Sequence, residues 1–253
     1  MAYPPLAAQL IVFSGQTDLE QNTESVLDAV SEAGFAAVEF GTSLRASDPQ
    51  RLKAMLDSKG LRVAGLHGGL DLDLDVTFRL MDAYGTQDLC ISGVGRWQGR
   101  SADTYLKDTG RLNEMARVCS TQGFRLHYHN HACEFAPTDR CLSGMELILA
   151  NLDTTVADLC VDVAWVHIGG EDPGIFLRRY DSMVGYVHLK DYVGDRHWVE
   201  LGQGVVPLDS VMRALASLHR VRWVVYEQDT SDRAAAESCA ISRQYLMDTF
   251  GCH

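Results

Sequence analysis

Three histidines and a glutamate fall within one short stretch of the chain, residues 126–135 (LHYHNHACEF). His127, His129 and His131 are spaced two apart, and in a β-strand such side chains share one face. Glu134 follows where that strand should end. Three imidazoles on one buried face need polar partners, which a metal ion or a polar substrate would supply. The stretch therefore indicates an enzyme site.

The elements that must position this site alternate along the chain. Eight short apolar runs are typical of strands: 8–13, 36–40, 62–66, 88–92, 125–130, 159–162, 186–190 and 223–227. Eight longer stretches are typical of helices: 19–32, 49–58, 75–84, 102–121, 144–152, 174–180, 208–218 and 234–249. Gly34, Gly60 and Gly123 lie between a helix and the next strand, where a left-handed helix cap is expected.

This alternation predicts a parallel sheet and an α/β fold. Eight strand–helix units in 253 residues fit one (β/α)₈ TIM barrel, with residues 1–253 as a single domain. The alternative is a doubly wound open sheet, which usually carries a Gly-rich turn after its first strand. Here that turn is Ser14-Gly15-Gln16, without the G-x-G-x-x-G pattern. The barrel is therefore favoured.

In a barrel of this type, active-site residues lie at the carboxyl ends of the strands. Six of the eight predicted strands end in histidine or a carboxylate: Glu39, His67, His129 with Glu134, Asp162, His188 and Glu227. Each has a structural alternative, since Asp162 could cap a turn, His188 could be a core histidine and Glu39 could form an ion pair inside the barrel. Taken together on one rim, they indicate a functional site.

The mixture of imidazole and carboxylate donors suits Mn²⁺, Zn²⁺, Co²⁺ or Fe²⁺. Oxygen-only sites favour Mg²⁺ or Ca²⁺, and thiolate sites favour structural Zn²⁺. One Asp, one His and two Glu would leave positions open for two oxygens of a hydroxy-ketone.

Composition excludes several other classes. The net charge of −12 argues against a nucleic-acid or anionic-membrane surface. The seven cysteines form no C-x-x-C pair, which indicates free thiols in a reducing compartment. The first residues lack a basic region followed by an apolar stretch, and no apolar run is long enough to span a membrane. We therefore expect a cytoplasmic protein with no membrane contact.

Seven segments carry a resemblance to a known family. The chain resembles the sugar phosphate isomerase/epimerase superfamily, the xylose isomerase-like TIM barrels, and within it the inosose dehydratase and 3-keto-sugar epimerase branch. The segments are 34–40 (GFAAVEF), 60–67 (GLRVAGLH), 128–135 (YHNHACEF), 161–165 (VDVAW), 187–191 (VHLKD), 201–204 (LGQG) and 224–229 (VVYEQD). The YHNHxxEF and WxxxEQD patterns are the specific ones.

The resemblance implies one divalent metal ion, Mn or Zn first, with Co, Fe or Mg also compatible. Family ligands come from the fifth to eighth strands, and Asp162, His188 and Glu227 match them directly. Many relatives have Glu-Asn-His on the fifth strand, where this chain has His129-Asn130-His131. We favour Glu134 as the remaining ligand, with His129 as a nearby contact; the opposite assignment stays open.

The resemblance also implies an activity, that of a sugar, keto-sugar or cyclitol isomerase or epimerase. Such enzymes move a proton next to a carbonyl through a metal-stabilised enediolate. The expected catalytic residues are Glu134, Glu227 and His129. The expected substrate-binding residues are His67, His131, Lys190, Glu39 and Trp97.

Several alternatives accompany this interpretation. The same metal and base would serve a dehydratase or lyase. A non-catalytic metal- or sugar-binding barrel that needs a partner subunit is a further alternative. The DNA-repair endonucleases of this fold are disfavoured by the acidic charge and by Trp165, where some of them have histidine. The expected partner is a small, non-phosphorylated sugar or cyclitol, and a homo-oligomer fits the family.

Overall fold

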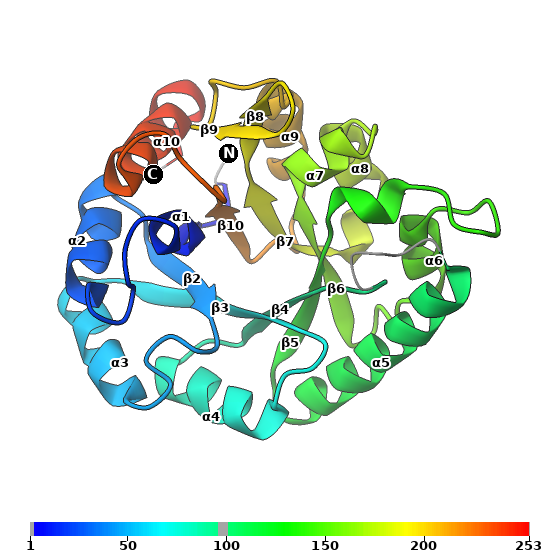
Figure 1. Ribbon diagram of the computed structural model, residues 1–253, viewed down its shortest axis with the longest axis horizontal. Helices are drawn as coiled ribbons and strands as arrows, with labels where there is room; N and C mark the ends of the chain where they lie inside the picture. The colour runs from blue at the N-terminus through cyan, green and yellow to red at the C-terminus, as the bar shows by residue number, and fades with distance from the viewer. Residues whose placement is uncertain (1–2, 96–100, 253) are drawn as a thin grey trace.

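The computed structural model describes residues 3–95 and 101–252 and shows a closed barrel of eight parallel strands (Figure 1). Around the barrel the strands follow the order β1-β10-β7-β6-β5-β4-β3-β2. Their bounds are β1 (Leu6–Gln9), β2 (Ala37–Gly41), β3 (Arg62–Gly69), β4 (Asp88–Ser92), β5 (Arg125–His129), β6 (Ala157–Asp162), β7 (Val184–Leu189) and β10 (Trp223–Tyr226). The predicted TIM barrel is confirmed.

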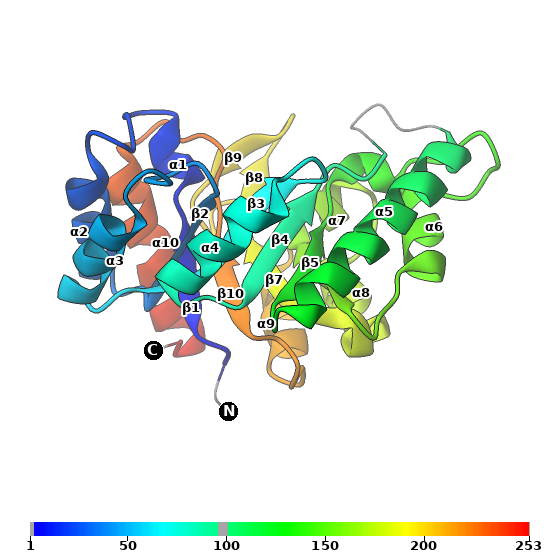
Figure 2. The same ribbon diagram turned by 90° about the horizontal axis from the view of Figure 1, so that it is seen from below.

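Most helices surround the barrel on its outside, whereas the short α1 lies inward of α2 and α10 (Figure 1), and Figure 2 shows the same arrangement from the side. They are α1 (Ile11–Ser14), α2 (Thr23–Ala33), α3 (Pro49–Ser58), α4 (Leu74–Tyr84), α5 (Ala102–Thr121), α6 (Gly144–Asn151), α7 (Val163–Ile168), α8 (Pro173–Arg179), α9 (Leu208–Leu215) and α10 (Ala235–Phe250), with 3₁₀ turns η1 (Ala132–Phe135) and η2 (Asp181–Met183). Gly34, Gly60 and Gly123 have positive φ of 90°, 68° and 81°, as predicted. Within residues 3–95 and 101–252, no helix is long and apolar enough to cross a membrane.

The first strand differs from its prediction. The run 8–13 was expected to be one strand, but β1 ends at Gln9 and α1 begins at Ile11. The Gln9 side chain accepts a hydrogen bond from the Ile11 backbone N–H at 2.6 Å, which turns the chain into α1. An apolar run does not by itself distinguish strand from helix, and here a local side-chain contact decides.

A small antiparallel hairpin, β8 (Asp191–Val193) with β9 (His197–Val199), was not predicted. Asp191 shapes the loop that follows, because its carboxylate accepts backbone N–H bonds from Gly202, Gly204 and Val206, each at 3.0 Å. At Gly204 a Cβ would lie 2.1 Å from an Asp191 oxygen, so only glycine fits. Asp191 therefore holds this loop in place through its carboxylate.

We call the carboxyl ends of the strands the upper end of the barrel and the amino ends the lower end. Beneath the upper end, the barrel interior is packed with apolar and aromatic side chains. Tyr186 and Trp223 lie among small residues, chiefly Ala7, Ala37, Ala64, Cys90 and Cys160. Gly65 leaves room for the Tyr186 ring, since a Cβ there would lie 3.1 Å from its hydroxyl. This layer makes the barrel a packed core beneath the site and not a channel.

Charged pairs cover the amino ends of the strands. The His127 Nε2 lies 2.8 Å from Asp88, and the Arg222 Nε lies 2.9 Å from the same carboxylate. Asp158 is bound by two arginines, Arg125 at 2.6 Å and Arg220 at 2.8 Å. His127 thus shares the inner face of β5 with His129, as the spacing predicted, but it belongs to this lower network and not to the upper site.

Candidate metal centre and active site

Four side chains converge at the carboxyl end of the barrel. They come from four neighbouring strands: His129 ends β5, Asp162 ends β6, His188 lies near the end of β7, and Glu227 follows β10. All four are buried, and one donor atom of each lies within 4.8 Å of the donor atoms of the other three. A buried His/Asp/His/Glu cluster is consistent with a divalent cation.

Asp162 provides the clearest sign that a cation fits here. Its Oδ1 accepts backbone N–H bonds from Ala164 and Trp165 at 2.9 and 3.0 Å, which caps α7. Its Oδ2 is buried and accepts no hydrogen bond; the Lys190 ammonium lies 3.5 Å away. Burial raises the pKa of Asp162 to about 6, with the charge of Lys190 opposing and that of Glu227 adding to the rise. A bound cation would satisfy the unbonded oxygen.

His188 is held between two carboxylates. Its Nδ1 bonds Glu227, and its Nε2 lies 3.2 Å from Glu39. Burial alone would lower the pKa of His188, but Glu39 and Glu227 hold it well above the ordinary value. Burial would raise the pKa of Glu39, yet His188 lowers it to about 2. Glu39 therefore fixes the orientation of this imidazole, as carboxylates commonly do behind metal-binding histidines.

The position of Glu39 bears on its expected contact with substrate. Its side chain is fully buried and contacts His188 and, at 3.4 Å, His67. The residues that line the nearby cavity include Phe40 and Gly41 but not Glu39. In this arrangement Glu39 reaches substrate only through the two histidines.

Lys190 supplies the positive charge of the site. Its Nζ lies 3.0 Å from both Glu227 and Asp229, and it packs 4.6 Å from the ring centre of Trp198. Burial would lower the pKa of Lys190, but Glu227 and Asp162 raise it above the ordinary value. With only 1 % of its surface exposed, Lys190 contacts carboxylates and not the cavity, where it was expected to bind substrate oxygens.

Glu134 lies apart from the cluster. It accepts hydrogen bonds from the Tyr128 hydroxyl at 2.6 Å and from the His131 backbone N–H at 3.0 Å. Tyr128 alternates with His127 and His129 along β5, so it points to the outer face of the strand, and Glu134 follows it there. Burial raises the pKa of Glu134 to about 7. The geometry thus favours His129 as the β5 donor, the assignment that the sequence had left second.

A cavity of about 620 Å³ opens above the cluster. His67, His129, His131 and Glu227 line it, which brings together four of the residues predicted from the sequence. Rings of neighbouring histidines lie 4.8–4.9 Å apart, from His67 to His129 and from His129 to His131. Trp97, predicted to contact substrate, lies outside the described residues.

Other lining residues were not predicted. Gln9, Ser92 and Asp229 add polar groups, and the apolar wall is formed by Leu10, Ile11, Leu19, Phe40 and Leu44. Gln9 and Ser92 stand at the carboxyl ends of β1 and β4, so strand position alone could have identified them. Asp229 lies within the EQD motif but had no assigned role.

Two curated relatives share the name inosose dehydratase. The protein from Geobacillus kaustophilus (strain HTA426) is 28 % identical over 194 residues, which cover 66 % of this chain and 61 % of the relative. The protein from Clostridium botulinum (strain Alaska E43 / Type E3) is 20 % identical, with 90 % of each chain covered. The match to the Geobacillus protein thus spans less than two thirds of its length.

Solved structures show the same fold. A sugar phosphate isomerase/epimerase from Parabacteroides distasonis ATCC 8503 superimposes with a TM-score of 0.83 at 19 % identity, covering 100 % of this chain and 96 % of the other. The IOLI protein with a bound zinc atom gives a TM-score of 0.74 at 14 % identity, covering 96 % and 97 %. D-allulose 3-epimerase from Methylomonas sp. in complex with D-allulose gives 0.73 at 16 % identity, covering 98 % of each chain.

A family model supplies the assignment. It matches residues 27–245, which include most of the barrel and all four residues of the cluster. The chain belongs to the xylose isomerase-like TIM barrel family.

Proposed function

We propose that this protein is a divalent-metal-dependent isomerase or epimerase of a sugar, keto-sugar or cyclitol that moves a proton next to a carbonyl group. The observation that carries the proposal is the His129/Asp162/His188/Glu227 cluster at the floor of an open cavity. The names of the structural neighbours, an isomerase/epimerase and a D-allulose 3-epimerase, support it.

The four cluster residues would hold the metal ion. Two imidazoles and two carboxylates favour Mn²⁺ or Zn²⁺. The zinc atom bound in the structure of the IOLI protein supports Zn²⁺ as a candidate. When bound, the cation would act as a Lewis acid that lowers the cost of negative charge beside the substrate carbonyl.

Proton transfer falls to the groups that border both cluster and cavity. Burial would raise the pKa of Glu227, but Lys190 and His188 hold it well below the ordinary value, so this carboxylate is ionised and can accept a proton. Burial and the charge of Lys190 lower the pKa of His131 to about 3, so its ring is neutral and can accept a hydrogen bond from a substrate hydroxyl. His67 borders the opposite part of the cavity and would bind a second hydroxyl.

Glu134 has a different role in this proposal from the one expected. Because it anchors the turn after β5 through the His131 backbone, it positions His131 and does not touch substrate. His129 takes its place as the β5 ligand.

The cavity favours an uncharged substrate. Among the described residues that line it, the ionisable ones are histidines and carboxylates, including Asp18, Glu20 and Asp229, and there is no lysine or arginine. A phosphate group would be repelled by these carboxylates. We therefore keep a non-phosphorylated sugar or cyclitol as the substrate, and the homo-oligomer remains a prediction.

Dehydration is the second candidate, because both curated relatives named above are called inosose dehydratase. The same base would remove the proton beside the carbonyl, and His67, which also lines the cavity, would then protonate a departing hydroxyl. The two reactions share the site and differ in their products.

The decisive experiment compares the wild type with Glu227→Gln. After loading with Mn²⁺, elemental analysis should find about one Mn per wild-type chain and little Mn in the variant. With keto-sugars and inososes in D₂O, NMR should show deuterium uptake beside the carbonyl for the wild type alone, whereas water loss would appear as an ultraviolet-absorbing unsaturated ketone. The exposed Glu237→Gln on α10 is the matched control and should behave as wild type. Glu227→Gln with full metal content and exchange would overturn the proposal.

A further inference from the structure

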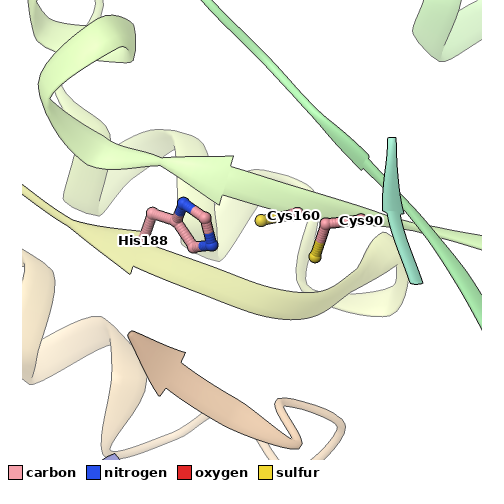
Figure 3. A group of neighbouring side chains, drawn as sticks. All are labelled: Cys90, Cys160 and His188. Carbon is pink, nitrogen blue, oxygen red and sulfur yellow. The ribbon is translucent and has the colours of Figure 1, made fainter. Parts of the chain in front are cut away.

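Two thiols lie directly beneath the upper cluster. Cys90 on β4 and Cys160 on β6 project into the barrel and are fully buried. Their sulfur atoms and a ring nitrogen of His188 all lie within 4.8 Å of one another. Figure 3 shows the three side chains next to one another inside the barrel. Both cysteines are free thiols.

A carboxylate adjoins this group. Glu39 lies 3.6 Å from the Cys90 sulfur and 3.2 Å from His188 Nε2. Two sulfurs, one nitrogen and one oxygen form a donor set suited to tetrahedral zinc. With zinc–sulfur bonds of about 2.3 Å and zinc–nitrogen bonds of about 2.0–2.1 Å, such donors stand roughly 3.3–3.8 Å apart. The two separations from Glu39, 3.6 and 3.2 Å, fall at or near this range. The other donor atoms lie within 4.8 Å of one another, so bringing them into the range requires shifts of at most about 1 Å.

We propose that Cys90, Cys160 and His188, with Glu39 as the fourth donor, form a second metal site that takes Zn²⁺ or a softer divalent cation. Thiolate donors select such cations, whereas the upper cluster contains no cysteine. On binding, two metal–sulfur bonds and one metal–nitrogen bond form, two S–H bonds and the N–H bond at His188 Nε2 break, and the three protons pass to solvent. No electron is transferred.

The two sites share His188. Its Nδ1 faces Glu227 in the upper cluster, and its Nε2 faces Glu39 below. A neutral imidazole has one nitrogen lone pair, because the other nitrogen carries a proton. A cation bound at Nε2 therefore leaves the proton on Nδ1, and a protonated Nδ1 cannot bind a cation in the upper site. The structure thus assigns competition between a thiophilic cation below and a catalytic cation above.

Cd²⁺ is the probe for this site, because cadmium–thiolate bonds give an ultraviolet charge-transfer band. Titration of the reduced, metal-free full chain should produce the band in the wild type. Cys90→Ala and Cys160→Ala should each weaken Cd²⁺ binding by more than about 100-fold, since a direct ligand should matter more than an outer partner, which is worth roughly 10–100-fold. Cys239→Ala, at a buried thiol on α10, and Cys141→Ala, at an exposed one, should leave the band unchanged.

Three further variants keep the outcome clear. Cys90→Ser and Cys160→Ser retain the side-chain size if an alanine variant fails to fold, as judged by circular dichroism. Asp162→Asn disables the upper cluster and should keep the cadmium band. Prior loading with Mn²⁺ should raise the Cd²⁺ concentration needed to produce the band. This effect should occur only in chains with an intact Asp162.

Absence of a band in the wild type, or a band that survives loss of either thiol, would overturn the proposal. Failure of Mn²⁺ to bind would count against the proposed function alone, because the thiol site does not depend on it.

Discussion

The two ends of the barrel both bury ionisable side chains, yet they balance them differently. At the amino end each of two carboxylates has an arginine close by: Asp88 contacts Arg222 and also His127, and Asp158 contacts Arg125 and Arg220. Burial alone would raise the pKa of Asp158, but its hydrogen bonds to Arg125 hold it below the ordinary value. These charges are satisfied within the chain.

At the carboxyl end the negative groups outnumber their partners. Lys190 and His188 face four carboxylates: Glu39, Asp162, Glu227 and Asp229. One oxygen of Asp162 accepts no hydrogen bond, and burial raises the pKa of Asp162 to about 6. Burying a charge without a partner costs free energy, so this end is complete only when a ligand supplies positive charge. The carboxylates of the amino end are paired with arginines, whereas the buried cluster at the carboxyl end is consistent with a divalent cation.

Asp162→Asn should have the largest effect of the substitutions considered, because it removes a carboxylate from the cluster at the carboxyl end. The variant should no longer bind Mn²⁺ at the upper cluster, and turnover should fall by at least about a thousandfold. Because the raised pKa of Asp162 means that its ionised form is unfavourable at neutral pH, the metal-free variant should be as stable as the metal-free wild type, or more stable by up to about 2 kcal/mol. Elemental analysis, an activity assay and urea unfolding measure the three quantities; a metal-free variant much less stable than wild type would contradict the comparison.

Asp88→Asn is the same substitution at the lower end and should have the opposite profile. It removes the charged partner of the half-exposed Arg222 and weakens the hydrogen-bond acceptor of the buried His127, which should lower the free energy of unfolding by about 1–3 kcal/mol. Metal content and turnover of the folded fraction should stay near wild type, because the packed layer of Tyr186 and Trp223 separates the two ends. Unfolding curves beside metal analysis give the result, and loss of metal from well-folded protein would show that the ends are coupled.

Much of this arrangement could be predicted from the sequence, because barrel strands repeat a simple rule. The alternation of strands and helices indicated the barrel, and the rule that carboxyl ends converge brought Asp162, His188 and Glu227 together before any coordinates. Asp162 and His188 lie on the adjoining strands β6 and β7, and Glu227 directly follows β10, the next strand around the barrel.

The turn after β5 could not be predicted in the same way. His127, His129 and His131 have the spacing of one strand face, but β5 ends at His129 and the chain then forms the turn η1. Within that turn the direction of Glu134 depends on Tyr128, whose hydroxyl bonds it on the outer face of the strand. Spacing along the chain carries no information about such a contact. The spacing therefore could not distinguish Glu134 from His129 as the β5 ligand, and the assignment of His129 stays a prediction.

Glu134→Gln tests whether Glu134 or His129 is the β5 ligand. Its expected effect on the protein is the smallest of the three. Burial raises the pKa of Glu134 from 4.5 to about 7, so the folded chain binds its proton more tightly than the unfolded chain does. Its contribution to stability is then fully present below about pH 4.5 and is lost as the pH rises through 7, a change of about 3 kcal/mol. Glutamine keeps an oxygen acceptor and has no charge, so the variant should be less sensitive to pH across this interval while retaining its metal ion. Urea unfolding at pH 5, 6, 7 and 8 would reveal the difference in slope. If Glu134 were instead a ligand, the same variant would lose metal as Asp162→Asn does, and the outer face of β5 would have to be counted as part of the functional end.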